Sequence, residues 1–243
     1  MQSWQQADEA PAPVKADLLL YAPCPVKLVV KERIEAIAAA QCPALATHIP
    51  MGCTSVDPYD PLYMETDVDK LPAIIASIGY GDFWRGEFVR RFVQQGVFAS
   101  VQPRVLNPLH AEARLVDPAG AYTIYGVTPY IFLVDHKKLD GLPAPRNWGD
   151  LTHPRYRGQV VMCGDGDDMA DAVLLNQYKD YGEPGVTGLA ANIKSFMHSS
   201  RMAKVCGTAA PDAGGIFIIP LFFAESTKMP DHVEVVWPED GAA

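Results

Sequence analysis

The side chains with the widest chemical range in this sequence are its five cysteines, at positions 24, 42, 53, 163 and 206. No two of them form a CxxC pair, and five cysteines in a chain of 243 residues are too few for a disulfide scaffold. The odd number leaves at least one cysteine outside an intramolecular disulfide. One disulfide is compatible with an oxidising compartment, and we expect Cys42, Cys163 and Cys206 to be core residues.

Cys24 and Cys53 are the pair of greatest interest, because each follows a predicted strand. They could form a disulfide, bind a soft metal together with His198 or Met51, or be two buried thiols. The disulfide and the buried thiols are favoured over the metal, because no ligand spacing is local. Cys24 could also act as a nucleophile with His198 as its base, so a cysteine-dependent hydrolase or transferase is an alternative function.

Other catalytic and metal-binding motifs are missing from the sequence. It contains no GxSxG elbow, P-loop, HExxH helix or GxGxxG. The GDGDD segment at 164–168 lacks the twelve-residue loop and the closing Glu of an EF-hand, so we expect a strand-to-helix turn with an Asp cap. If its carboxylates faced a ligand, they would favour a cation. We expect no cofactor and no enzymatic activity.

Composition narrows the classes of partner. The net charge of −9 and the dispersed basic residues argue against nucleic acid and anionic membrane surfaces. No apolar run reaches the roughly 18 to 20 residues that span a bilayer. The polar, acidic N-terminus does not read as a secretory signal, so either the signal is absent from this sequence or the protein is cytoplasmic, for example a ligand-sensing protein.

The first half of the chain alternates predicted strands and helices, which indicates a mostly parallel sheet whose ligands gather at the carboxyl ends of its strands. Asp82 can cap the helix that carries Phe83, Phe88 and Phe92. The other elements expected here are a strand at Asp17–Tyr21, a helix from Pro25 to about Ala38, a strand at Ala44–Ile49 and a short helix at Leu71–Ala76.

In the second half, a long strand is predicted over Tyr122–Val134, interrupted at Pro129. On such a strand Tyr122 and Tyr130 share a face and Tyr125 points the other way. The remaining expected elements are a strand at Gln159–Cys163, helices near 168–180 and 186–203, an apolar segment at 215–223 and a last strand at Val233–Val236.

Three ordered segments carry a family resemblance. Residues 145–158 read PxxWxDLxxPxYxG, residues 215–224 read GIFIIPLFFA, and residues 233–242 read VEVVWPEDGA. Together they resemble type 2 periplasmic solute-binding proteins of ABC importers, in the iron, thiamine, polyamine and phosphonate branch. The resemblance is weaker over residues 1–115.

The resemblance implies an α/β, two-lobed periplasmic-binding-protein type 2 fold, with mixed, mostly parallel sheets flanked by helices. The expected organisation is a flexible tail at 1–16, lobe 1 at 17–115, lobe 2 at 116–236 and the start of a return hinge at 237–243. The resemblance implies that lobe 1 is incomplete, because the family's usual return to it is missing, and an uncovered apolar face would favour self-association.

The function implied is that of a periplasmic or extracytoplasmic binding protein. It would capture a small-molecule or ion ligand in an interlobe cleft, close about a hinge, and present the ligand to an ABC transporter permease. Ferric members are recognised by adjacent tyrosines, and this sequence has no Tyr-Tyr pair, so ferric binding is disfavoured.

In such a fold the ligand contacts come from loops at the carboxyl ends of strands and from helix N-termini. Glycines and prolines at these places have an equally ordinary role as turn formers. His198, Ser199 and Arg201 could supply hydrogen bonds and one positive charge for an anion. The residues nominated are Cys24, Pro25, Met51, Gly52, Cys53, Gly79, Tyr80, Gly81 and Asp82 in lobe 1, and Tyr125, Gly164, Asp165, Gly166, His198, Ser199, Arg201, Pro220 and Phe222 in lobe 2.

Overall fold

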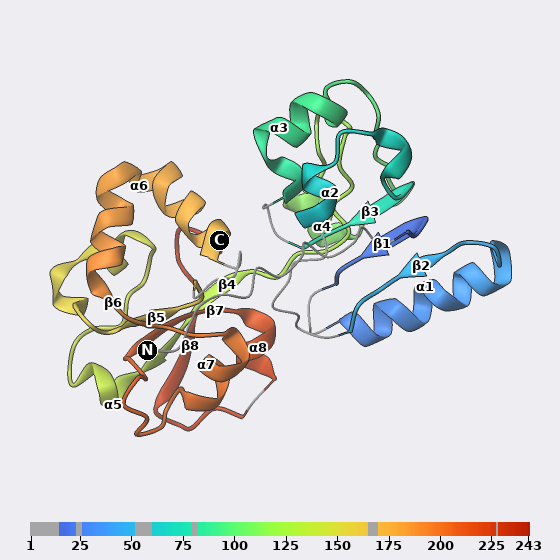
Figure 1. Cartoon of the computed structure of the whole chain (residues 1–243). Coiled ribbons are helices and arrows are strands. Elements are labelled where there is room, and N and C mark those ends of the chain that lie inside the picture. Colours follow the sequence, from blue (N-terminus) through green and yellow to red (C-terminus); the bar gives the residue numbers. More distant parts are fainter. Residues whose placement is uncertain (1–14, 23–25, 52–59, 79–81, 165–169, 227) are drawn as a thin grey trace, which may run out of the picture. The chain divides into compact units, whose positions relative to one another are not determined.

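A computed structural model describes residues 15–22, 26–51, 60–78, 82–164, 170–226 and 228–243. The chain divides into two units, residues 1–125 and 126–243 (Figure 1). This boundary lies further along the chain than the one expected after residue 115. Residues 117–122 stay with the first unit because the Gly120 carbonyl accepts from Ser100 N–H at 3.1 Å and the Tyr122 hydroxyl donates to the Phe83 carbonyl at 2.7 Å. The Tyr122 ring stacks on Trp84, with ring centroids 4.0 Å apart.

The first unit is built on a small parallel sheet with the strand order β2-β1-β3. The short helix predicted at Leu71–Ala76 is wrong: residues 74–76 form a strand that pairs with Leu18–Leu20. The run of Ile74 and Ile75 suits a strand, since β-branched side chains favour extended backbone. The strand predicted at Ala44–Ile49 is much shorter than expected. The three strands are β1 (Leu18–Leu20), β2 (Thr47–His48) and β3 (Ile74–Ala76).

Each face of this sheet has its own small core. The predicted first helix is confirmed as α1 (Lys27–Gln41), whose Val30 and Ile34 pack against Leu18 and Leu20. Leu19 belongs to the other core, which is rich in phenylalanine. The helical segment predicted to carry these phenylalanines is confirmed, although it is divided into three turns. The remaining helices of the unit are α2 (Asp60–Met64), η1 (Val68–Lys70), η2 (Asp82–Trp84), α3 (Gly86–Phe88), the π-helical η3 (Val89–Val93) and α4 (Pro108–Glu112).

The second unit is built on a mixed sheet with the order β6-β5-β7-β4-β8. β5 runs parallel to β6 and β7, and β4 runs antiparallel to β7 and β8. The predicted strand Val233–Val236 is confirmed. The long strand predicted from Tyr122 is wrong, because the strand begins only at Tyr130, directly after Pro129. The strands are β4 (Tyr130–Asp135), β5 (Val160–Met162), β6 (Ile193–Phe196), β7 (Ile216–Pro220) and β8 (Val233–Val236).

The second predicted helix of this half, near 186–203, is wrong in its middle. Strand β6 separates the long helix α6 from α7, and it pairs in parallel with β5. α6 itself is kinked at Gly182, whose φ of 65° lies in the left-handed region, two residues before Pro184. The helices of the second unit are α5 (His136–Leu139), η4 (Gly149–Thr152), η5 (Pro154–Tyr156), α6 (Asp171–Asn192), α7 (Ser199–Val205) and α8 (Leu221–Glu225).

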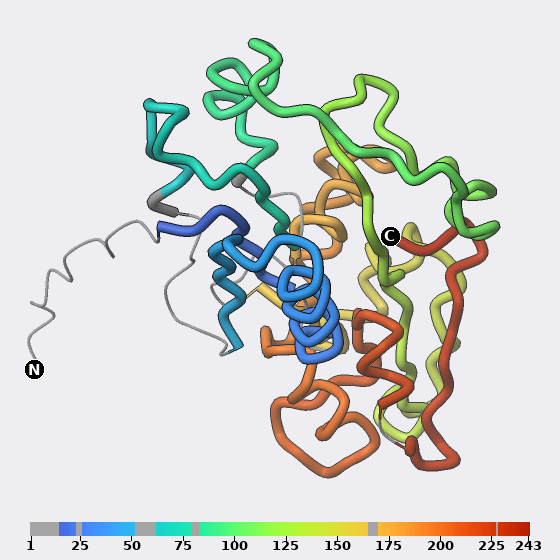
Figure 2. Tube along the Cα trace, turned by 90° about the vertical axis from the view of Figure 1, so that its right-hand side faces the viewer, coloured from blue at the N-terminus to red at the C-terminus, as the bar shows by residue number. Residues whose placement is uncertain are grey.

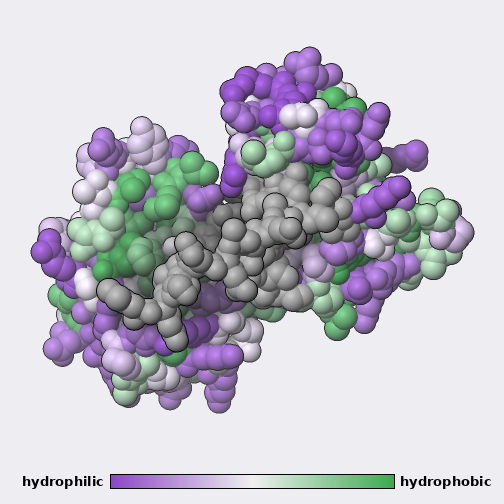
Figure 3. All heavy atoms as spheres, viewed as in Figure 1, coloured by the Kyte–Doolittle hydropathy of each residue, from purple (hydrophilic) through white to green (hydrophobic). Residues whose placement is uncertain are grey.

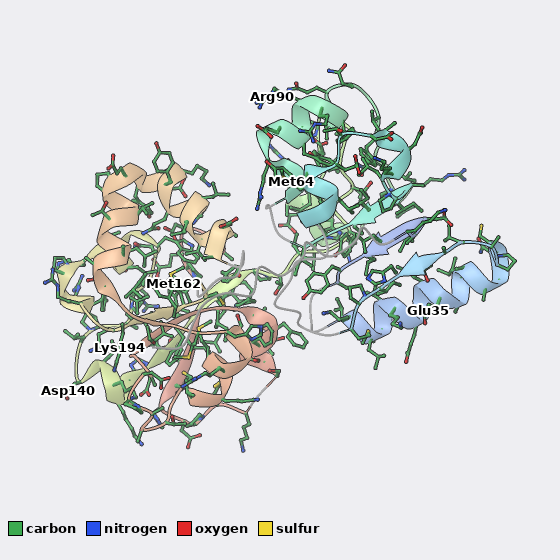
Figure 4. All side chains as sticks on the ribbon, in the orientation of Figure 1. Glu35, Met64, Arg90, Asp140, Met162 and Lys194 are labelled. Atoms are coloured by element: carbon green, nitrogen blue, oxygen red, sulfur yellow. The ribbon has the colours of Figure 1, made fainter. Side chains whose placement is uncertain are left out.

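The three central strands of this sheet, β5, β7 and β4, are buried on both faces. Along β4, Phe132 and Val134 enter one core, and Ile131 and Leu133 enter the other, as the two-residue strand period requires. Met162 of β5 lies in the first of these cores, between the sheet and α6 (Figure 4). The outer face of α6 adds to the apolar surface in that part of the unit (Figure 3), where Leu174 and Leu175 are exposed.

Candidate ligand-binding site

The three parallel strands of the first unit end at the same edge of their sheet. The residues described directly after them are Tyr21 and Ala22, then Ile49 to Met51, then Ser77 and Ile78. Met51, a nominated ligand residue, is exposed here. Most other nominated residues of this unit lie outside the described residues, namely Cys24, Pro25, Gly52, Cys53, Gly79, Tyr80, Gly81 and the side chain of Asp82. The pairing of Cys24 with Cys53 therefore stays a prediction.

Tyr125 lies in the first unit rather than the second. Its hydroxyl donates a hydrogen bond to the Ser77 carbonyl, with 3.2 Å between the oxygens. Ser77 follows β3 directly, so Tyr125 lies at the carboxyl edge of the first sheet. The predicted arrangement of Tyr122, Tyr125 and Tyr130 on one strand is wrong, because strand β4 contains only Tyr130.

In the second unit, β5, β6 and β7 also end at one edge. Gly164 follows β5, His198 follows β6, and Phe222 follows β7. β4 begins at the same edge, where Leu221 N–H donates to the Pro129 carbonyl at 2.9 Å. The structure thus brings together the nominated residues Gly164, His198, Ser199, Pro220 and Phe222, while Asp165 and Gly166 lie outside the described residues.

His198 is held at this edge by two kinds of contact. Its Nδ1 accepts a hydrogen bond from Ser200 N–H at 3.2 Å, which caps α7. Its ring lies edge-on to Phe223, with centroids 6.1 Å apart. Because Nδ1 is the acceptor, the neutral imidazole carries its proton on Nε2 and can donate it to a ligand.

Ser199 and Pro220 support the edge rather than line it. Ser199 is 2% exposed, and its Oγ lies 2.9 Å from Cys163 Sγ, which joins the end of β5 to the start of α7. Pro220 is buried opposite Tyr130 in the sheet. Neither side chain is exposed to a solute.

Arg201 does not offer the unopposed positive charge that the sequence suggested. Its guanidinium donates a hydrogen bond to the Asp212 carboxylate and forms an ion pair with it. Both groups are partly exposed, so the pair is worth little to stability. It nevertheless offsets the charge expected to attract an anion.

Phe196, which the sequence did not nominate, also lies at this edge. It is the last residue of β6 and is 47% exposed. A Cβ atom placed on Gly164 would lie only 3.1 Å from the Phe196 ring, so the ring lies against the end of β5. The sequence gives no strand signal here, because Ile193 and Phe196 flank two polar residues and the apolar and polar residues do not alternate.

The remaining cysteines divide by burial. Cys163 and Cys206 are buried, as expected, while Cys42 is exposed, so that expectation was wrong. Cys42 follows the last turn of α1, where its N–H donates to the Ala38 carbonyl and its side chain is exposed. Burial, with a smaller effect of the Asp135 charge, raises the pKa of Cys206 to about 12, so this thiol is a poor nucleophile at neutral pH.

The opposite edge of the second sheet carries an open groove of about 620 Å³. It lies after β4 and before β8, apart from the residues that follow β5, β6 and β7. The groove is lined by Lys137, Lys228, Met229, Pro230, Asp231 and His232.

Among the described residues, no three His, Cys, Asp or Glu side chains gather as a metal site would require, and no helix is long and apolar enough to cross a membrane.

Comparison with known families gives one match. The profile of a family described as bacterial extracellular solute-binding protein matches residues 69–243. This range includes β3 and the whole second unit. No curated protein sequence matches the chain.

Solved structures with a similar fold include a periplasmic binding protein and a ferric binding protein. The ferric binding protein of Campylobacter jejuni has a TM-score of 0.60 and 12% identity, covering 93% of this chain and 72% of its own. The Trichodesmium protein IdiA (FutA), solved with iron and citrate, has a TM-score of 0.59 and 11% identity. The match covers 93% of this chain and 72% of the Trichodesmium chain. The periplasmic binding protein P5PA has a TM-score of 0.56 and 15% identity, covering 91% and 69%. The predicted fold class is confirmed.

Proposed function

Because this chain belongs to the bacterial extracellular solute-binding proteins, we propose that it captures a small solute outside the cytoplasm for the permease of an ABC transporter. Proteins of this family bind solutes rather than transform them, which supports a role without catalysis. The alternative that pairs Cys24 with His198 in a hydrolase or transferase stays a prediction, because Cys24 lies outside the described residues.

The observation that carries this proposal is the convergence of strand ends in the second unit. Open α/β sheets bind ligands beyond the carboxyl ends of their parallel strands. At that edge the protein presents a hydrogen-bond donor on His198 and exposed aromatic surface on Phe222. We therefore assign solute contacts to His198 and Phe222.

Ser199 and Pro220 have a positioning role in this proposal. The contact between Ser199 and Cys163 fixes the start of α7, and with it the imidazole of His198. Pro220 ends β7 directly before the helix that carries Phe222. Residues held by packing in this way keep a site in shape before the ligand arrives, which lowers the entropy lost on binding.

Closure of two lobes around the solute stays a prediction. It requires a solute-dependent change at the connection between the units, near Tyr125 and Gly126. Small-angle scattering with and without a tightly bound solute measures it directly, and profiles that do not change would contradict closure while leaving solute capture intact.

Native mass spectrometry of freshly purified protein tests the function itself. The expected result is a co-purifying small molecule or ion that is released on denaturation. His198→Ala and Phe222→Ala should lower its occupancy, and Tyr178→Ala, which removes an exposed aromatic ring from α6, should leave it unchanged. Equal occupancy in all three variants would place the solute elsewhere.

A further inference from the structure

Helix α1 exposes apolar side chains where a helix that covers a sheet usually presents polar ones. Val30 and Ile34 pack against β1 and account for its buried side. Away from them, Leu28 is 55% exposed, Val29 is 69% exposed and Ile37 is 46% exposed. The hydrophobic effect favours covering a surface of this kind, and such surfaces mark interaction sites.

Small residues continue the exposed surface toward the end of α1. Ala36, Ala39 and Ala40 are all exposed. Ala36 lies two turns after Val29 on the same side of the helix, because residues three and four apart are neighbours there. Alanine lets another helix approach closely, so a helix that carries Val29 at the level of Ala36 fits this surface.

Two opposite charges lie between Val29 and Ala36. Glu32 and Arg33 are exposed, and within the described part of the chain neither belongs to an ion pair. The other two charges of this stretch, Lys31 and Glu35, pair with each other at 3.1 Å. The exposed surface thus carries one unused negative charge and one unused positive charge side by side.

These residues are complementary to themselves in one arrangement. When two copies of α1 run antiparallel with Val29 against Ala36 of the second copy, Glu32 comes level with Arg33 of the second copy, because both pairs share one midpoint along the helix. A two-fold axis repeats every contact, so both opposite-charge contacts form together. A parallel arrangement in register would instead place Glu32 beside Glu32 and Arg33 beside Arg33.

We propose that the protein forms a two-fold dimer in which α1 packs antiparallel against α1 of a second copy. The helix belongs to the unit for which the sequence predicts self-association. A helix of 15 residues is about 22 Å long, and one of its faces offers less than the roughly 800 Å² per partner of a standard interface. The dimer is therefore weak and dissociates on dilution. It is independent of the proposed function.

Sedimentation equilibrium of the full chain over a series of concentrations tests the dimer. The mass should rise with concentration above the 26.5 kDa of one chain. Glu32→Arg or Arg33→Glu alone places like charges in both contacts, and each should raise the dissociation constant by about fivefold or more. The variant that carries both substitutions exchanges the two charges at unchanged net charge, and it should restore the dimer.

Glu183→Arg is the control, since it makes the same change of charge at an exposed position of α6. It should leave the dissociation constant unchanged, and circular dichroism should show that every variant keeps its helices. A monomer at all concentrations would overturn the proposal and leave the surface of α1 to a different partner. A doubly substituted variant that associates no better than the single ones would also overturn it, as would a loss in Glu183→Arg equal to that in Glu32→Arg. Solute occupancy, measured separately, is not altered by any of these results.

Discussion

The carboxylate of Asp240 accepts a hydrogen bond from the backbone N–H of Trp148, at 3.1 Å and across 92 positions of sequence. The same carboxylate accepts a hydrogen bond from the Tyr181 hydroxyl at 2.8 Å. The Trp148 indole N–H donates to the Gly241 carbonyl, and the chain continues until the Ala243 carbonyl accepts from Tyr130 N–H at the start of β4 (Figure 2). Residues 237–243, expected as the start of a return hinge, are thus joined to the second unit.

Asp240→Asn should destabilise the second unit by about 1 kcal/mol, because it weakens two charge-assisted hydrogen bonds at a partly solvated site. Urea denaturation followed by tryptophan fluorescence measures this change. Asp231→Asn, at an exposed aspartate of the open groove, is the control and should have little effect. Equal loss in the two variants would contradict a specific role for Asp240.

Trp148→Phe should cost about 2–4 kcal/mol of unfolding free energy. The indole is 1% exposed, packs edge-on against Phe132 at 4.8 Å and donates to Gly241, so the variant loses volume and a buried hydrogen bond. Trp237→Phe is the matched control, since that indole is 53% exposed. Similar melting curves for the two variants would show that Trp148 is not a core residue.

Gly214→Ala should prevent folding of the second unit or destabilise it by about 1–3 kcal/mol or more. The new Cβ would lie 2.1 Å from the Gln159 carbonyl oxygen. That oxygen cannot easily move, because it accepts a hydrogen bond from Ile216 N–H at the start of β7. Gly126→Ala, where nothing lies within 4 Å, is the control. Yields of soluble protein and circular dichroism report the outcome, and a normally folded Gly214→Ala would contradict the predicted clash.

Alkaline pH should weaken the fold through Cys206. Burial raises the pKa of its thiol from 9.0 to about 12, so above pH 9 the unfolded chain ionises this group while the folded chain keeps it neutral. Its contribution is complete below pH 9 and is lost progressively as the pH approaches 12. The slope of stability against pH between 9 and 10.5 should therefore be shallower in Cys206→Ala than in the unchanged protein. Parallel slopes would contradict the raised pKa.

The sequence predicted best the elements in which apolar side chains occupy the buried positions. The run Val233–Val236 and the apolar run after Gly215 became β8 and β7. Trp148 and Tyr156, which belong to the family-like segment 145–158, lie in a buried core. There the Tyr156 hydroxyl donates to the Pro143 carbonyl.

The errors arose where tertiary pairing overrides local preference. Residues 193–196 form β6 because β5 offers a parallel partner along its length, although the flanking residues favour helix. The same error hid Phe196 from the candidate site. Tyr122 belongs to the first unit because its hydroxyl and ring find partners at Phe83 and Trp84, which no local pattern reveals.

The division at Tyr125 and Gly126 gives each unit its own hydrophobic cores. On heating, each unit is therefore expected to unfold cooperatively by itself. A calorimetric trace should then contain two unfolding transitions of different enthalpy. The second unit, whose three central strands are buried on both faces, should account for the later one. A solute bound by only one unit would then shift one transition and leave the other in place, which makes the heat-capacity profile a record of where the solute binds.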